Sequence, residues 1–288
     1  MANVRANGID IEYETFGDAT SEPLLLIMGF GRQMIAWPDG LCKALVERGF
    51  FVVRYDNRDM GLSTMMRGER VTNASPATAA APYTIDDMAD DAAGLLEALE
   101  IRGAHIVGAS MGGMIAQSLA IRRPELVLSL TSIMSSTGDP AVLRSDPDVL
   151  RAISEPPPAD RQTAIARAVK IAEAIGSKGM INEERVRDVA ARSWDRNPSH
   201  DGLERQRLAM AGSSDRTGAL RLLSVPTLVI HGEIDPLVSV SAGEATADAI
   251  PGARLLTIPG MGHDLPEPLW PQVVEAIAEV AGRATSTV

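Results

Sequence analysis

The stretch HIVGASMGGMIAQ, from His105 to Gln117, places a serine between an apolar run and a helical pattern. Within it, GASMG matches G-x-S-x-G, in which small residues allow a sharp turn between a strand and a helix. Such a turn exposes the Ser110 hydroxyl and leaves the backbone N–H of Met111 at the start of a helix. We therefore expect Ser110 to be a nucleophile and the Met111 N–H to stabilise developing negative charge.

A serine hydroxyl is a weak nucleophile near neutral pH, so it needs a base that removes its proton. The chain has four histidines. His263 lies in IPGMGHDLPEP, a glycine-rich loop after the last expected strand, and such a loop can fold back over the strand ends. We therefore expect His263 to be the base. His105 is expected in a buried strand and His200 as a solvated helix-cap residue. His231 ends an expected strand, where it could lie near the site, although a packing role is favoured.

The base in turn needs an acid that orients it. Asp235, in HGEIDPLV, directly follows an expected strand and precedes Pro236, which limits its freedom. Asp139, in STGDP after the preceding strand, is the alternative position. Asp264 adjoins the expected base and is expected to be a surface residue. The favoured set gives the chain order Ser, Asp, His.

A second donor to the developing oxyanion is expected from the turn after the strand LLLIM. Here the sequence is MGFGRQMIAWP, and the backbone N–H of Phe30 is the candidate. Gly29-x-Gly31 after a strand also matches part of a dinucleotide-binding pattern. The third glycine of that pattern is replaced by Met34, so the sequence favours no nicotinamide cofactor. We expect neither a cofactor nor a metal.

The elements that must position these residues follow an alternating pattern. Apolar runs typical of buried strands alternate with helical patterns, which predicts a mostly parallel central sheet with helices on both faces. A hairpin is expected around Asn7-Gly8. The expected strands are 24–28, 50–55, 105–109, 126–134, 227–232 and 253–259, and the expected helices are 37–48, 84–100, 111–122, 241–249 and 268–283.

One interval breaks this alternation. Residues 135–221 contain helical patterns and no convincing strand, which predicts a helical cap inserted after the sixth strand. Residues 1–134 and 222–288 would then form the core domain. Residues 64–82, rich in Ala, Pro, Ser and Thr, are expected to form a flexible loop.

Composition limits the partners. The net charge of −11 disfavours nucleic acid and anionic membranes. No run reaches the roughly 18 apolar residues of a membrane span, and the first residues lack the features of a secretory signal, so a cytoplasmic protein is expected. Cys42 is the sole cysteine and is expected to be buried. The sequence does not address oligomeric state.

Two further groups of residues lie near the expected strand ends. The charged stretch RYDNRDMGLS, residues 54–63, is expected to order its own loop and to support the oxyanion turn. Contact of Arg58 with the substrate is the alternative. Five methionines would line an adaptable apolar pocket or pack in the core: Met28, Met34, Met111, Met114 and Met134.

Taken in order, LLLIMGFG, RYDNRDMGLS, VGASMGGMIAQ, PTLVIHGEIDPLV and IPGMGH resemble the α/β-hydrolase superfamily along nearly the whole chain. The chain looks most like bacterial esterases of the aclacinomycin methylesterase type, which hydrolyse a methyl ester on a polyketide. The resemblance implies an α/β-hydrolase fold, with Ser110 as nucleophile, His263 as base, Asp235 as acid and oxyanion donors at Phe30 and Met111. The family commonly has glycine where this chain has an aspartate after Arg58, and the cap matches no motif.

The expected function is that of a serine esterase acting on a small, largely apolar ester through an acyl-enzyme intermediate. A lactonase or a carbon–carbon bond hydrolase would use the same three residues. A ligand-binding protein of the same fold with negligible turnover is the alternative outside enzymes.

Overall fold

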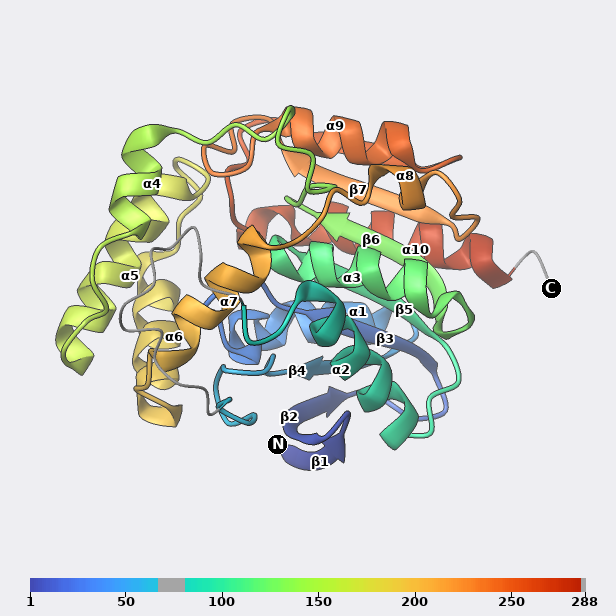
Figure 1. The fold of residues 1–288 in the computed structure, drawn as a ribbon, viewed down its shortest axis with the longest axis horizontal. Coiled ribbons are helices and arrows are strands. Elements are labelled where there is room, and N and C mark those ends of the chain that lie inside the picture. Colours follow the sequence, from blue (N-terminus) through green and yellow to red (C-terminus); the bar gives the residue numbers. More distant parts are fainter. Residues whose placement is uncertain (67–80, 286–288) are drawn as a thin grey trace.

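The computed structural model describes residues 1–66 and 81–285, so most of the expected flexible loop 64–82 lies outside the described residues. Its centre is an eight-stranded sheet in the order β1-β2-β4-β3-β5-β6-β7-β8 (Figure 1). The pairs β1/β2 and β2/β4 are antiparallel, and all other pairs are parallel. The strands are β1 Ala2–Ala6, β2 Ile9–Phe16, β3 Glu22–Ile27, β4 Phe50–Tyr55, β5 Ala104–Ala109, β6 Val127–Ile133, β7 Thr227–Gly232 and β8 Arg254–Ile258.

Both faces of the sheet are covered by helices, which explains why inner strands such as β3 and β4 have apolar runs without alternation. Along β3, Leu24 and Leu26 belong to one apolar cluster, and Leu25 and Ile27 belong to the other. The first cluster includes residues of α1 and α10, and the second includes residues of α2, α3 and α9. The core helices are α1 Asp39–Glu47, α2 Ile85–Ala98, α3 Met111–Arg122, α9 Val240–Ala249 and α10 Trp270–Thr285. The predicted mostly parallel sheet with helices on both faces is confirmed.

Local signals explain where the helices begin. The Thr84 hydroxyl accepts from the Asp87 N–H at 3.1 Å, and the Asp87 carboxylate accepts from the Thr84 N–H at 2.7 Å, which starts α2. Cys42 lies on the buried face of α1, and burial raises the pKa of its thiol to about 12. Three short 3₁₀ helices complete the core: Met34–Ala36, Pro124–Leu126 and Glu267–Leu269.

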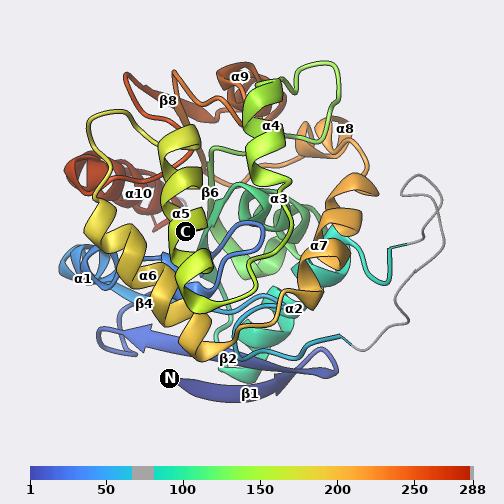
Figure 2. The ribbon, with the colours of Figure 1, turned by 90° about the vertical axis from the view of Figure 1, so that its left-hand side faces the viewer.

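The helices that follow the sixth strand form a separate group. They are α4 Pro147–Ile153, α5 Arg161–Ile175, α6 Glu183–Arg196, α7 Asp201–Ala211 and the short α8 Thr217–Leu220, all between β6 and β7. Figures 1 and 2 show α4 to α7 together on one side of the sheet, in front of the end of β6. The predicted helical insertion is therefore confirmed, whereas the division into core 1–134 and 222–288 and cap 135–221 stays a prediction.

Among the residues that the structure describes, no helix combines the length and the apolar character needed to cross a membrane.

Candidate active site

Ser110 occupies the turn between β5 and α3 in an uncommon conformation, with φ +56° and ψ −121°. The two glycines of the motif leave no room for a side chain. A Cβ on Gly108 would lie 2.1 Å from the Gly112 carbonyl oxygen, and one on Gly112 would lie 2.1 Å from that of Ile27. The tight crossing of strand and helix therefore requires both glycines, and it leaves Ser110 partly exposed at the strand end.

The structure brings Ser110 together with a histidine and an aspartate from two other loops. The Ser110 Oγ lies 3.0 Å from His263 Nε2, and His263 Nδ1 lies 2.7 Å from Asp235 Oδ2. The other carboxylate oxygen of Asp235 accepts from the N–H groups of Leu237 and Val238, both at 2.9 Å. With Nδ1–H donating to the carboxylate, the lone pair of His263 Nε2 faces the serine hydroxyl, which is the arrangement needed for proton removal.

The loop that carries His263 is bound to the end of α5. The His263 N–H donates to the Ile175 carbonyl at 2.7 Å, and the Gly262 N–H donates to the Ser177 hydroxyl at 3.0 Å. Asp264 is half-buried and accepts from both the N–H and the hydroxyl of Ser177, at 2.9 and 2.5 Å. The expectation that Asp264 is a surface residue is therefore wrong, since its carboxylate joins the base loop to the insertion.

Among the remaining histidines, His231 adjoins Asp235, whereas His105, His200 and the alternative acid Asp139 make other contacts. His231 is fully buried, and its Nε2–H donates to the Val238 carbonyl at 2.8 Å. The same atom lies 3.6 Å from Asp235 Oδ2, and burial lowers the pKa of the imidazole. His105 is fully buried in β5, whereas His200 is half-buried beside Trp194 instead of solvated. The Asp139 carboxylate accepts from the nearby Ala141 N–H at 2.8 Å.

The two expected oxyanion donors flank the nucleophile. Met111 is the first residue of α3, and Phe30 follows Gly29, where a Cβ would lie 3.1 Å from the Cβ of Ser110. Within the described residues, neither the Phe30 N–H nor the Met111 N–H donates to a protein acceptor. Both N–H groups are therefore available to an oxygen on the substrate.

Arg58 forms a buried ion pair inside the core. Its guanidinium donates to Asp91 at 2.5 and 2.7 Å, both side chains are buried, and the Tyr83 ring lies 4.9 Å from the guanidinium carbon. Burial alone would disfavour this charge, but the Asp91 carboxylate raises the pKa of Arg58. The alternative of an Arg58 contact with substrate finds no support in this geometry.

The two aspartates of the same loop contact the insertion, which sequence reasoning missed. Asp56 accepts from the Met34 N–H at 2.6 Å and pairs with Arg196 of α6 at 2.8 Å. Asp59 pairs with Arg205 of α7 at 2.6 and 2.9 Å. Both aspartate side chains are fully buried, so the arginines of the insertion neutralise charges that the core has buried. Sequence offered no signal for these pairs, because Arg54 and Arg58 stand beside the two aspartates in the chain but bind other carboxylates, Glu14 and Asp91.

Four of the five methionines near the strand ends are buried in the core: Met28, Met34, Met111 and Met134, with Met114 packed against it. The burial of these methionines supports the interpretation that they pack in the core over the alternative that they line a pocket.

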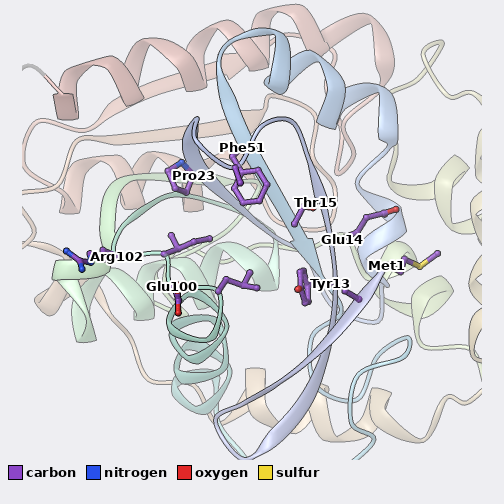
Figure 3. A pocket seen from close by; sticks show the side chains of 12 residues that line it. Met1, Tyr13, Glu14, Thr15, Pro23, Phe51, Glu100 and Arg102 are labelled. Carbon is purple, nitrogen blue, oxygen red and sulfur yellow. The ribbon is translucent and has the colours of Figure 1, made fainter.

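A hollow of about 620 Å³ lies elsewhere, between the β1-β2 hairpin and the loop that precedes β5 (Figure 3). It is lined by residues such as Tyr13, Phe51 and Arg102 and contains none of the three residues around Ser110. It is therefore separate from the candidate active site.

Within residues 1–66 and 81–285, no three His, Cys, Asp or Glu side chains are grouped as metal ligands would be.

The sequence is similar to those of known proteins along most of the chain. A sequence profile for the alpha/beta hydrolase fold matches residues 22–267. The chain is 30% identical over 295 residues to rhodomycin D methylesterase DauP from Streptomyces sp. (strain C5), covering 94% of this chain and 95% of that protein.

Solved structures show the same fold. A meta-cleavage product hydrolase (CumD) from Pseudomonas fluorescens IP01 superposes with a TM-score of 0.77 at 21% identity, covering 99% of this chain and 98% of that chain. A thermophilic esterase from Thermogutta terrifontis superposes with a TM-score of 0.72 at 25% identity, covering 99% of both chains.

Proposed function

The chain belongs to the α/β-hydrolase fold family, whose methylesterase members support ester hydrolysis, and we propose that it is a serine esterase acting on a small, largely apolar ester. The observation that carries this proposal is the hydrogen-bonded series from Ser110 Oγ through His263 to Asp235, at 3.0 and 2.7 Å. The similarity to DauP extends over nearly the whole of both chains, which supports an ester as the substrate.

The proposed reaction has two steps. His263 takes the hydroxyl proton of Ser110 as the oxygen attacks the ester carbonyl, and it then gives that proton to the departing alcohol. A covalent acyl-enzyme is left on Ser110. Water, activated by the same imidazole, attacks the acyl-enzyme and releases the acid. Asp235 stabilises the imidazolium in both steps, and the N–H groups of Leu237 and Val238 hold this carboxylate in place.

Both tetrahedral intermediates carry a negative oxygen that needs donors. We assign this role to the N–H groups of Phe30 and Met111, which lie on either side of the nucleophile. The Met111 N–H also belongs to the first turn of α3, where the helix dipole favours negative charge. One such donor is worth about 3 kcal/mol of barrier, so the shape of the Phe30 turn matters for rate.

Turnover of p-nitrophenyl butyrate by wild type and Ser110→Ala tests the proposal. We expect wild-type hydrolysis and covalent labelling by a fluorophosphonate probe, and we expect both to be lost in Ser110→Ala. Full turnover by Ser110→Ala would show that Ser110 is not the nucleophile. Negligible turnover with slow labelling of wild type would indicate a ligand-binding protein.

Comparing kcat/KM on methyl esters, lactones and vinylogous diketones then identifies which type of bond the protein cleaves. The esterase proposal requires the highest kcat/KM on an ester, and a preference for a lactone or a diketone would overturn it in favour of those reactions.

A further inference from the structure

Helix α7 of the insertion reaches directly to the turn that carries Phe30. Gln206 on this helix is fully buried, and both ends of its amide are used. Its Oε1 accepts from the Gly31 N–H at 3.0 Å, and its Nε2 donates to the Arg58 carbonyl at 3.0 Å. One side chain therefore joins the turn after β3 to the loop after β4.

The packing around Gln206 leaves α7 little freedom to shift. A Cβ on Gly202 would lie 2.3 Å from the Asp59 carbonyl oxygen, and one on Gly31 would lie 2.8 Å from Leu203 Cδ2. The two hydrogen bonds between Arg205 and Asp59 hold the same helix on the same loop. Asp59 itself has φ +68°, a conformation that favours glycine, so the loop has an uncommon backbone shape at the residue that pairs with Arg205.

The hydrogen bond between Gln206 and the Gly31 N–H acts on the backbone next to Phe30. This N–H belongs to the peptide group that follows Phe30, so holding it limits rotation of the backbone on one side of Phe30. On the other side, Gly29 is packed against Ser110 at a distance that excludes any side chain. The direction of the Phe30 N–H is thus set between the nucleophile and Gln206.

We propose that Gln206 is a positioning residue for the oxyanion turn, so that the helical insertion supplies part of the reaction geometry as well as covering the site. The inference rests on the proposed function, since it concerns the donor that the esterase mechanism assigns to Phe30. A misdirected donor would weaken binding of the transition state more than binding of the ester itself.

The test compares Gln206→Met with wild type in p-nitrophenyl ester hydrolysis. Methionine keeps the length and apolar packing but removes the acceptor for the Gly31 N–H and the donor to the Arg58 carbonyl. We expect kcat to fall roughly 10 to 100-fold, as for a misplaced oxyanion donor, with KM changed by less than about threefold. The pH dependence of kcat/KM should stay unchanged, because the contacts of His263 are untouched.

Two matched variants separate positioning from general loosening. Gln206→Glu keeps an acceptor for the Gly31 N–H and loses only the donor to the Arg58 carbonyl, so it should retain more activity than Gln206→Met. Asn197→Ala removes another amide contact between the insertion and the core, the one to the Gly61 carbonyl, and should leave kcat within about twofold of wild type. Thermal unfolding of each variant reports whether it is folded.

A trifluoromethyl ketone inhibitor adds a readout specific to the oxyanion. It forms a covalent adduct with the serine whose oxygen occupies the oxyanion position, so its Ki should rise in Gln206→Met by the same factor as kcat/KM falls. If Gln206→Met does not fold, Gln206→Asn, which shortens the reach by one methylene, should show the same two changes.

Wild-type kcat and Ki in a folded Gln206→Met, or an equal loss in Asn197→Ala, would overturn the inference. In either case a wild-type activity that depends on Ser110 leaves the proposed function standing. Absence of Ser110-dependent ester hydrolysis in wild type would remove both proposals together.

Discussion

At the residue scale, a residue of the candidate site was predictable where the sequence pattern around it determines its place in the fold. Ser110 lies between two glycines whose Cβ atoms would overlap with backbone, and Asp235 and His263 each follow a strand of a parallel sheet, whose carboxyl ends share one edge. Gln206 was not predictable, since nothing in its helix indicates that residue 31 will lie beside it. Asp264 was misjudged for the same reason: its partner Ser177 is 87 residues away in the chain.

Asp235→Asn tests the proposed acid. An asparagine would turn its carbonyl toward the N–H groups of Leu237 and Val238 and its amide N–H₂ toward His263 Nδ1, which would favour the wrong tautomer. We expect kcat for ester hydrolysis to fall about 10³ to 10⁴-fold with the fold intact. Asp139→Asn is the control and should keep wild-type kcat. A large loss in the control with little change in Asp235→Asn would assign the acid to Asp139.

At the element scale, the strands and core helices were predictable because each shows either a continuous apolar run or a helical pattern. The placement of the insertion was not, because it depends on contacts between distant loops. The last residue of α5, Ile175, and Ser177 just after it hold the base loop, while α7 holds the oxyanion turn through Gln206. Two helices of one insertion thus contact two different parts of the proposed machinery.

Ser177→Ala tests the first of these contacts. The alanine removes the hydroxyl that donates to Asp264 and accepts from the Gly262 N–H, so the loop next to His263 loses two hydrogen bonds. We expect the free energy of unfolding to fall by about 1–3 kcal/mol and kcat to fall several-fold. Ser154→Ala, at the exposed end of α4, is the control and should change neither quantity. A stability loss with unchanged kcat would limit Ser177 to a structural role.

At the scale of the whole molecule, core and insertion share a network of buried charge. The pairs Asp56 with Arg196 and Asp59 with Arg205 cross between them, and each aspartate is fully buried. Removing one partner of such a pair leaves a buried charge uncompensated, which costs far more than the pair itself contributes. Core and insertion are therefore expected to unfold in one transition, although no motif in residues 135–221 indicates where the insertion lies on the core.

The pH dependence of stability follows from the two fully buried histidines, His105 and His231. Burial lowers the pKa of both imidazoles, so each is more readily protonated in the unfolded chain, where a histidine has a pKa of about 6.5. Below that pH the unfolded state binds more protons than the folded state, and the free energy of unfolding must fall as pH falls. Urea unfolding between pH 8 and 5.5 should show this decline. His105→Gln, in which the amide can still contact the Ser129 hydroxyl, should show a smaller decline, and equal slopes for both proteins would refute the role of His105.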